Sequence, residues 1–364
     1  MHVMYNTRTD RTTTPGLRTH ALRARLLTLA VSTALATTGL TALGAITLPA
    51  SASVMQTEVF VGDLNGGFGV YNATNGTKTF TDDHLSGIPV DLIANPAGTL
   101  LYEVDTMDDY VSVFSTQTDA GVGSLPVCNR PQSEALNAAT STLYVSCNTS
   151  NGGSDTEVDV INAADPAALT LTARIPFPSS PYGMVVDTAT NMLYVDDDYG
   201  IAKVSMATNT VTGSFGAPAG SLALNAAGSV LYDAVGNQVY LIAVSSNSVF
   251  GSLTLPAGTG SSAICPSTGM LYVAGNGVTT VINTTIPAVV GSLALSGGSL
   301  ALSSDCGTLF ELNGDSVDMA NTATGAISAV SFPANDILSM AVARVPVQLI
   351  YNPTPLPLPF SALP

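Results

Sequence analysis

Short apolar runs alternate with polar turns along most of the chain, and this pattern predicts many short β-strands. Runs rich in Val, Leu, Ile and Tyr are separated by turn signals such as Asn95-Pro96-Ala97-Gly98 and Asn225-Ala226-Ala227-Gly228. Gly, Pro and Asn at such places supply the backbone angles that tight turns need. Because no amphipathic helical stretch of useful length intervenes, the pattern predicts an all-β fold.

An apolar-aromatic residue pair recurs along the chain, and the number of its occurrences gives the number of repeats. Its aromatic members are 42, 42, 50, 38, 40 and 38 residues apart. A repeat of this length with four strands per unit predicts a seven-bladed β-propeller, because one four-stranded sheet cannot bury both faces without stacked neighbours. The pairs are Val59-Phe60, Leu101-Tyr102, Leu143-Tyr144, Leu193-Tyr194, Leu231-Tyr232, Leu271-Tyr272 and Leu309-Phe310. A second marker, Val-x-Gly-Ser-Leu or a close variant, ends at Leu125, Phe215, Leu253, Leu293 and Phe332.

The order of strands within each unit predicts how the ring closes. We expect an innermost strand, a, to precede the strand with the aromatic pair, b, while strands c and d follow outward. The candidate a strands lie near Val90, Glu134, Met184, Leu222, Ser262, Leu300 and Met340. The chain would then begin with strands b, c and d of one blade and return at residues 340–344 to supply its a strand. Such closure removes the open edge of the sheet.

Several repeats resemble those of a known family. The Leu-Tyr-Val opening at residues 143–147 and 271–275 is similar to the repeat of the YVTN family of bacterial seven-bladed propellers. The Val-Asp-Val-Ile-Asn strand and turn at 158–162 and the Pro-Tyr-Gly entry at 181–183 are similar too. The resemblance covers roughly residues 57–346 and implies the fold, whereas members of that family differ in role. Most repeats here depart from the usual Tyr-Val-Thr-Asn and Asp-containing turns.

The first 53 residues read as a signal peptide rather than as part of the ring. An uncharged stretch at 26–48 precedes Ala50-Ser51-Ala52, which fits a signal-peptidase site. The basic residues before that stretch are Arg8, Arg11, Arg18, Arg23 and Arg25. An uncleaved membrane anchor is the alternative, since an apolar run of about 22 residues can span a bilayer. The Thr, Gly and Ser content of the run favours cleavage near Ala52, hence a secreted, periplasmic or cell-surface protein without a stable membrane span.

The remaining chain divides into one propeller domain at residues 54–348 and a Pro-rich tail at 349–364. Proline lacks the amide donor of a strand ladder, so we expect the tail to be extended and exposed. An alternative role for the tail is a binding segment for another surface protein.

Charge excludes some classes of partner. Without residues 1–53 the chain keeps 5 basic against 25 acidic residues, a net charge of about −20. Such a surface repels nucleic acid and anionic lipid, whose binding relies on clustered Lys and Arg. Divalent cations, basic partners and neutral ligands are compatible with it.

Four cysteines fall in the predicted propeller, and four cysteines allow three disulfide connectivities. The blade order places Cys128 in a d–a loop and Cys147 at the end of the following b strand. It places Cys265 at the end of an a strand and Cys306 in the a–b turn of the next blade. Proximity favours the pairs Cys128–Cys147 and Cys265–Cys306, and free buried thiols are the alternative.

Acidic residues gather on the face that carries the b–c and d–a loops, here called the top face. Calcium prefers several oxygen ligands in a flexible arrangement, so two runs of acids are calcium candidates. These candidates are Asp105, Asp108, Asp109, Asp196, Asp197 and Asp198, and the other acids expected on this face are Asp63, Asp155, Glu157 and Asp315. Solvated acidic turns that keep the protein soluble are the alternative. No other cofactor is expected.

One neighbourhood could carry catalysis. His84 and Arg130 fall in d–a loops of adjacent predicted blades, near Asp105 and Glu134. In such a site His84 would act as base and Arg130 as anion clamp. The remaining sequence after residue 53 has no further histidine, and it offers no Gly-rich phosphate loop or paired-Cys metal motif.

These observations favour a binding or cell-surface scaffold outside the cytoplasm, monomeric, that holds a protein, an envelope component or a small ligand at its top face. The alternative is a propeller hydrolase or lyase, lactonase-like, with its site at the top mouth of the channel.

Overall fold

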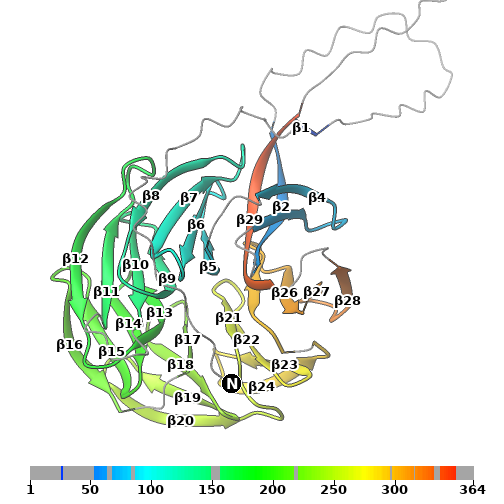
Figure 1. Ribbon diagram of the computed structural model, residues 1–364. Helices are drawn as coiled ribbons and strands as arrows, with labels where there is room; N and C mark the ends of the chain where they lie inside the picture. The colour runs from blue at the N-terminus through cyan, green and yellow to red at the C-terminus, as the bar shows by residue number, and fades with distance from the viewer. Residues whose placement is uncertain are drawn as a thin grey trace, which may run out of the picture.

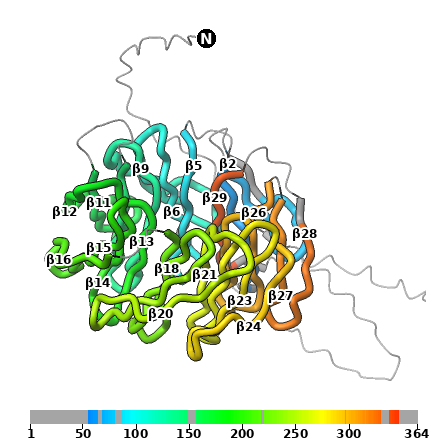
Figure 2. The backbone as a smooth tube through the Cα atoms, turned by 90° about the horizontal axis from the view of Figure 1, so that it is seen from below, coloured from blue at the N-terminus to red at the C-terminus, as the bar shows by residue number. Residues whose placement is uncertain are grey.

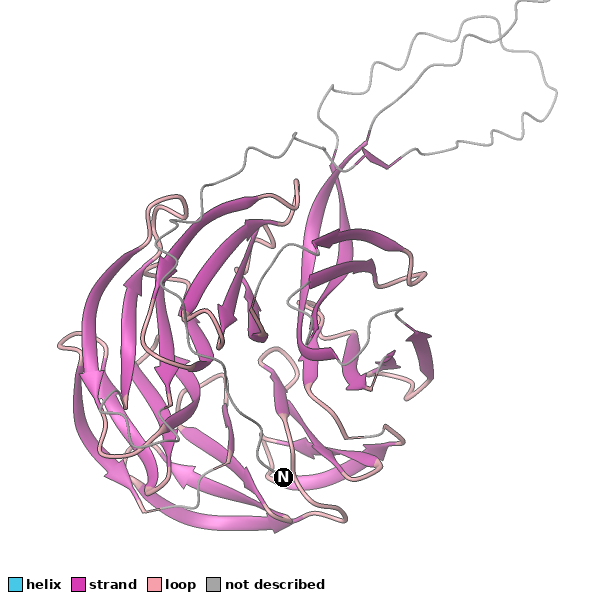
Figure 3. Cartoon of the chain, in the orientation of Figure 1, coloured by secondary structure: helices cyan, strands magenta, loops and turns pink. Residues whose placement is uncertain are grey.

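The protein is a ring of seven antiparallel sheets, as the sequence predicts (Figure 1). The computed structural model describes residues 26–27, 53–63, 68–82, 87–148, 156–216, 220–295, 297–314, 316–331 and 337–349. Every regular element in these ranges is a strand (Figure 3). Within the same ranges there is no helix of the length and apolarity needed to cross a membrane.

The first four blades each place the a strand innermost. Blade 1 consists of β29 (Ile337–Leu349), β2 (Ser53–Asp63), β3 (Phe68–Asn72) and β4 (Lys78–Asp82). Blade 2 consists of β5 (Pro89–Ala94), β6 (Leu100–Asp105), β7 (Tyr110–Ser115) and β8 (Gly121–Pro126). Blade 3 consists of β9 (Pro131–Asn137), β10 (Thr142–Cys147), β11 (Glu157–Asn162) and β12 (Thr170–Pro176). Blade 4 consists of β13 (Pro181–Asp187), β14 (Met192–Asp197), β15 (Gly200–Ser205) and β16 (Thr210–Phe215).

The last three blades follow the same order. Blade 5 consists of β17 (Ser221–Leu224), β18 (Val230–Val235), β19 (Gln238–Ala243) and β20 (Ser248–Thr254). Blade 6 consists of β21 (Ser262–Cys265), β22 (Met270–Gly275), β23 (Val278–Asn283) and β24 (Ala288–Leu293). Blade 7 consists of β25 (Leu300–Leu302), β26 (Thr308–Asn313), β27 (Ser316–Asn321) and β28 (Ile327–Ser331). A two-residue strand, β1 (Leu26–Leu27), pairs in parallel with the end of β29.

The ring closes in blade 1, where strands from the two ends of the propeller share one sheet. β29 runs antiparallel to β2 from the pair Ser53–Gln348 to the pair Asp63–Ile337. In Figure 1 this junction is the contact between the blue β2 and the red β29. The predicted closure by N-terminal b, c and d strands and a C-terminal a strand is therefore confirmed, and it pairs the inner edge of β2.

The repeated apolar-aromatic pair explains how neighbouring blades pack. Successive side chains of a strand point to opposite faces of its sheet. In each b strand the aromatic residue faces the following blade, while the apolar residue before it faces the preceding one. Tyr102 of blade 2 packs with Leu143 of blade 3 in one buried cluster, and Phe310 of blade 7 packs with Val59 of blade 1 in another. Each of the seven apolar clusters joins two adjacent blades.

The outer strands carry irregularities that suit an exposed edge. In blades 1 to 6 the register between strands c and d shifts once along the pair, as between Val160 and Ile161. A bulge twists an edge strand and makes it a poorer template for a foreign strand. Large apolar side chains such as Phe250 and Val290 are nevertheless exposed on β20 and β24, which lie on the outside of the ring (Figure 2).

The predicted turn at residues 95–98 joins strands a and b of blade 2. The Asn95 side-chain oxygen accepts hydrogen bonds from the amides of Thr99 and Leu100. Gly98 has a φ of +65°, and a β-carbon there would collide with the carbonyl of Arg344 in β29. Glycine is therefore required both by the turn and by the closing strand of blade 1.

Candidate functional site at the central channel

Two disulfides form with the predicted pairing. Cys128 bonds to Cys147 with a Cα–Cα distance of 5.9 Å, and Cys265 bonds to Cys306 with a Cα–Cα distance of 5.8 Å. The first joins the loop before blade 3 to the end of its b strand, and the second joins blades 6 and 7. Disulfides are typical of proteins in oxidising, extracellular environments.

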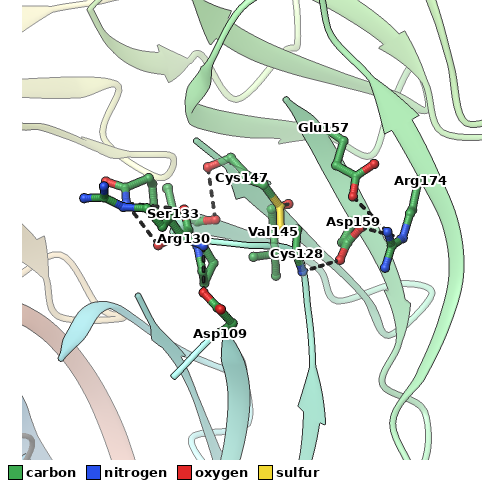
Figure 4. The surroundings of a disulfide bond; sticks show 12 residues. Asp109, Cys128, Arg130, Ser133, Val145, Cys147, Glu157, Asp159 and Arg174 are labelled. Atoms are coloured by element: carbon green, nitrogen blue, oxygen red, sulfur yellow. Dashed lines mark hydrogen bonds and ion pairs between the residues drawn. A yellow bond between two sulfur atoms is a disulfide. The ribbon is translucent and has the colours of Figure 1, made fainter. Parts of the chain in front are cut away.

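The buried carboxylate of Asp159 lies beside the Cys128–Cys147 disulfide (Figure 4). The amide of Cys128 donates to Asp159 Oδ2 at 3.0 Å, and Arg174 Nε lies 3.5 Å from Asp159 Oδ1. The two sulfurs and the Asp159 carboxylate lie within 4.8 Å of one another, a spacing that could suit a metal ion. Sulfurs joined in a disulfide are not thiolate ligands, so this cluster is a structural support for the loop.

The structure describes three of the four residues of the predicted catalytic group. His84 lies outside the described residues. Arg130 is exposed, and its backbone amide donates to Asp109 Oδ1 at 2.7 Å (Figure 4). Asp105 is buried, and its Oδ1 accepts hydrogen bonds from the amides of Ile88, Met107 and Asp108. Asp105 and Asp109 therefore brace the loops of the top face.

Glu134, the fourth predicted residue, belongs to a buried group at the wall of the channel. Its neighbour Asp91 accepts hydrogen bonds through Oδ2 from the Ser133 hydroxyl and the Glu134 amide, both at 2.9 Å. Burial, with added repulsion from Asp91 and Glu103, holds the pKa of Glu134 well above its ordinary value. Burial also raises the pKa of Asp91. The Asp91 carboxylate thus joins blade 2 to blade 3 through the Ser133 hydroxyl and the Glu134 backbone amide.

The a strands surround a cavity of about 430 Å³ on the axis of the ring. At one level along the channel axis, a small or polar residue lies in each a strand or immediately before it. We call this set of seven residues the channel ring. The channel ring consists of Asp91, Ser133, Gly183, Ser221, Ser261, Ser299 and Ser339. All except Ser339 line the cavity. Four hydroxyl groups and one carboxylate of the channel ring therefore offer several donors and acceptors to the cavity at the same level.

The acids of the two predicted calcium sites lie in different surroundings. Asp108 is exposed on its loop. Asp197 Oδ1 accepts from the Tyr199 amide at 2.8 Å, and Asp198 Oδ1 accepts from the Tyr182 hydroxyl at 3.2 Å. Asp196 points elsewhere, into the interface between blades 4 and 5.

Asp233 of blade 5 is the charged neighbour of Asp196 in that interface. Burial, then Asp233 and the adjacent Asp197 and Asp198, raises the pKa of Asp196 to about 8. Burial raises the pKa of Asp233 to about 7. Among the described residues no basic side chain acts on either carboxyl, although an opposite charge normally accompanies a buried acid.

The sequence pattern did not single out Asp91 or Asp233, because each is an isolated acid in a strand. The available signal was an alignment of the repeats on their aromatic residues. It places Asp91 in a column of five serines and one glycine, and it places Asp233 in a column that has valine in four other b strands and glutamate in two. Asp91 is the one acid in its column, and such a departure indicates a position that the fold alone does not explain.

No protein-family model and no curated protein sequence matches this chain. Among solved structures, it is similar to a functionally unknown protein from Desulfotomaculum acetoxidans, with a TM-score of 0.69 and 10% identity, over 79% of this chain and 99% of that one. It is also similar to hydrazine synthase from Kuenenia stuttgartiensis, with a TM-score of 0.58 and 14% identity, over 74% of this chain and 90% of that one. At such low identity these likenesses concern the fold alone.

Proposed function

We propose that this chain is an exported binding propeller that holds a polar small ligand in its central channel. The channel ring carries the proposal: hydroxyls from several blades and the carboxylate of Asp91 converge on one cavity of about 430 Å³. Ligand sites in proteins are concave and place a few convergent polar groups to orient the ligand.

The chemistry of the lining indicates the class of ligand. Serine hydroxyls both donate and accept, while the Asp91 carboxylate accepts only. The whole chain carries a net charge of −16, so an anionic ligand would be repelled. A neutral polyhydroxylated compound or a compound with one amino group therefore suits the channel best.

A thermal-shift screen tests this function. Neutral sugars, polyols and amino sugars, with sugar acids as the anionic counterparts, would be added at millimolar concentration to the full chain. We expect neutral or amino compounds to raise the melting temperature. Ser299→Val should abolish this increase, because it replaces a hydroxyl of the channel wall with methyl groups. Ser252→Val, on the exposed outer strand β20, is the matched control. A ligand that stabilises the Ser299→Val variant as much as wild type would refute channel binding.

The raised pKa of Glu134, which lies beside Asp91, supports a second candidate function, that of a lactonase-like hydrolase or lyase. A carboxyl whose pKa is raised can stay protonated near neutral pH and act as a general acid. Glu134 has such a carboxyl, and Asp91 beside it lines the cavity. Turnover of a lactone and ester panel that is lost in Glu134→Gln would favour the enzyme, and an inactive wild type would favour binding alone.

Export and family membership belong to the same proposal. The signal-peptide pattern in residues 1–53 supports secretion, and the two disulfides are compatible with it. The repeats at 143–147 and 271–275 support a place among the YVTN propellers. In this view the mature protein acts as a monomer in the periplasm, at the cell surface or outside the cell, without a nucleic-acid partner. Mass spectrometry of the mature N-terminus would test cleavage near Ala52.

A further inference from the structure

Asp196 and Asp233 meet across the interface between blades 4 and 5. Asp196 lies two residues after Tyr194 in β14, so both side chains lie on the same face, which packs against blade 5. Asp233 lies two residues after Leu231 in β18, on the face that packs against blade 4. The two carboxyls are 5% and 0% exposed, respectively.

Three of the four oxygens of these carboxyls have no hydrogen-bond partner among the described residues. Asp196 Oδ1 and both carboxyl oxygens of Asp233 are buried without a hydrogen bond in the described part of the chain. They therefore do not hydrogen-bond to each other. Leaving a buried carboxylate without a hydrogen bond or counter-charge is among the costliest arrangements in a protein interior.

The other blade interfaces show that the fold does not require acids here. The equivalent pair between blades 2 and 3 is Val104 with Val145, and that between blades 5 and 6 is Ala234 with Val273. Two neutral pairs of this kind fill the same position in the same ring.

Where one acid stands at the position of Asp233 it faces a neutral residue: Glu103 faces Gly62 and Glu311 faces Ala274. Glu311 of blade 7 accepts from the Thr279 hydroxyl at 2.7 Å and from the Gly297 amide. Of the seven blade interfaces, that between blades 4 and 5 is the one with an acid on both sides of this position. Exceptions to local rules are expected at functional sites.

The pair lies one strand behind the channel wall, next to open space. Asp196 is opposite the bulge in β13 that contains Gly183, and Asp233 pairs with Leu222; Gly183 and Leu222 both line the channel cavity. A β-carbon on Gly183 would find only the Gly220 carbonyl oxygen, 3.9 Å away. The missing side chain therefore leaves room between the two blades for water or an ion to reach the acids.

We propose that Asp196 and Asp233 bind a hard divalent cation of the calcium class between blades 4 and 5. Two carboxylates supply up to four of the six to eight oxygen ligands that calcium takes, and water from the channel would supply others. The cation would neutralise both acids and tie the two blades together. Of the run at 196–198 only Asp196 is a proposed ligand, because Asp197 and Asp198 accept hydrogen bonds from the Tyr199 amide and the Tyr182 hydroxyl.

Titration of chelator-treated full-length protein with CaCl₂ tests the site. We expect isothermal titration calorimetry to give one site per chain, and saturating CaCl₂ to raise the melting temperature by several degrees, because a ligand of the folded state stabilises it. Asp233→Asn should lose both effects. Asp198→Asn, which changes an adjacent exposed acid, should keep them.

A double variant guards against misfolding as an explanation. Asp196→Ala/Asp233→Val copies the Ala234–Val273 pair of the next interface, so it should fold and melt cooperatively without responding to CaCl₂. Wild type that neither binds CaCl₂ nor melts higher with it would overturn the proposal and leave a pair of protonated acids. Binding of one calcium ion by the double variant would overturn it too. Ser299→Val should still bind calcium, so failure of the channel function is distinguishable from failure of this site.

Discussion

The hydroxyl of Ser339 in β29 donates a hydrogen bond to the carbonyl oxygen of Pro89 in β5 at 2.7 Å, although 250 residues separate them in the chain. This bond joins the closing strand of blade 1 to the a strand of blade 2. Both residues lie where the a strands surround the channel. The last strand thus holds its own blade through β2 and the next blade through its side chain.

Removal of the closing strand should destabilise the whole ring. Deletion of residues 337–364 removes β29, exposes the paired edge of β2 and uncovers the apolar face shared with blade 2. We expect loss of the cooperative thermal transition in circular dichroism. Deletion of residues 350–364 alone is the control and should melt like wild type. A cooperative transition at the wild-type temperature without β29 would contradict this mode of closure.

The two disulfides should contribute unequally to stability. In the chain-entropy model a cross-link stabilises more when it closes a longer loop. The separations are 19 residues for Cys128–Cys147 and 41 residues for Cys265–Cys306. Paired Cys→Ser variants should therefore lose about 3 and about 4 kcal/mol, respectively. Urea unfolding of oxidised protein measures this difference, and a reducing agent should make all variants equal to wild type; a persistent gap would indicate a packing effect of serine.

The pKa of Glu134 should make stability fall as pH rises. Its folded-state pKa lies above the unfolded value, so the folded protein holds a proton that the unfolded chain has lost. The stabilisation is complete below the ordinary carboxyl pKa and disappears as pH rises toward the folded value. Glu134→Gln should reduce the loss in melting temperature between about pH 5 and about pH 8. The exposed-acid variant Asp108→Asn should keep the wild-type slope, and an equally steep Glu134→Gln slope would refute the assignment.

The aromatic residues of the b strands should dominate the packing energy. Tyr144 is buried against Leu193 of the following blade. Tyr144→Ala should cost about 3–5 kcal/mol, because it removes a large buried side chain and leaves a cavity. Tyr199, which is 75% exposed, offers a matched control whose Ala variant should change stability by less than about 0.5 kcal/mol. Urea midpoints compare the two, and similar losses would argue against interface packing as the main source of stability.

Local pattern was sufficient for the blades but insufficient for the channel. The apolar-aromatic pairs, the turn at 95–98 and the cysteine spacing each reflect short-range geometry or the order of strands, so they were readable in advance. Asp105 and Glu134 were singled out as members of one candidate site, yet their surroundings differ. Loop amides surround the Asp105 carboxyl, whereas Asp91 and the preceding blade surround Glu134. No sequence spacing distinguishes these two environments.

The amino-acid sequence by itself determined the number of blades, the order of their strands and the disulfide pairing, because a forty-residue repeat with period-two alternation can bury its faces only in a ring. Only the tertiary structure decided which acids face one another. Asp196 and Asp233 become neighbours because two successive blades turn opposite faces of their b strands toward a shared interface. The same stacking gathers Asp91 and the serines around one axis, although each residue is alone in its own repeat.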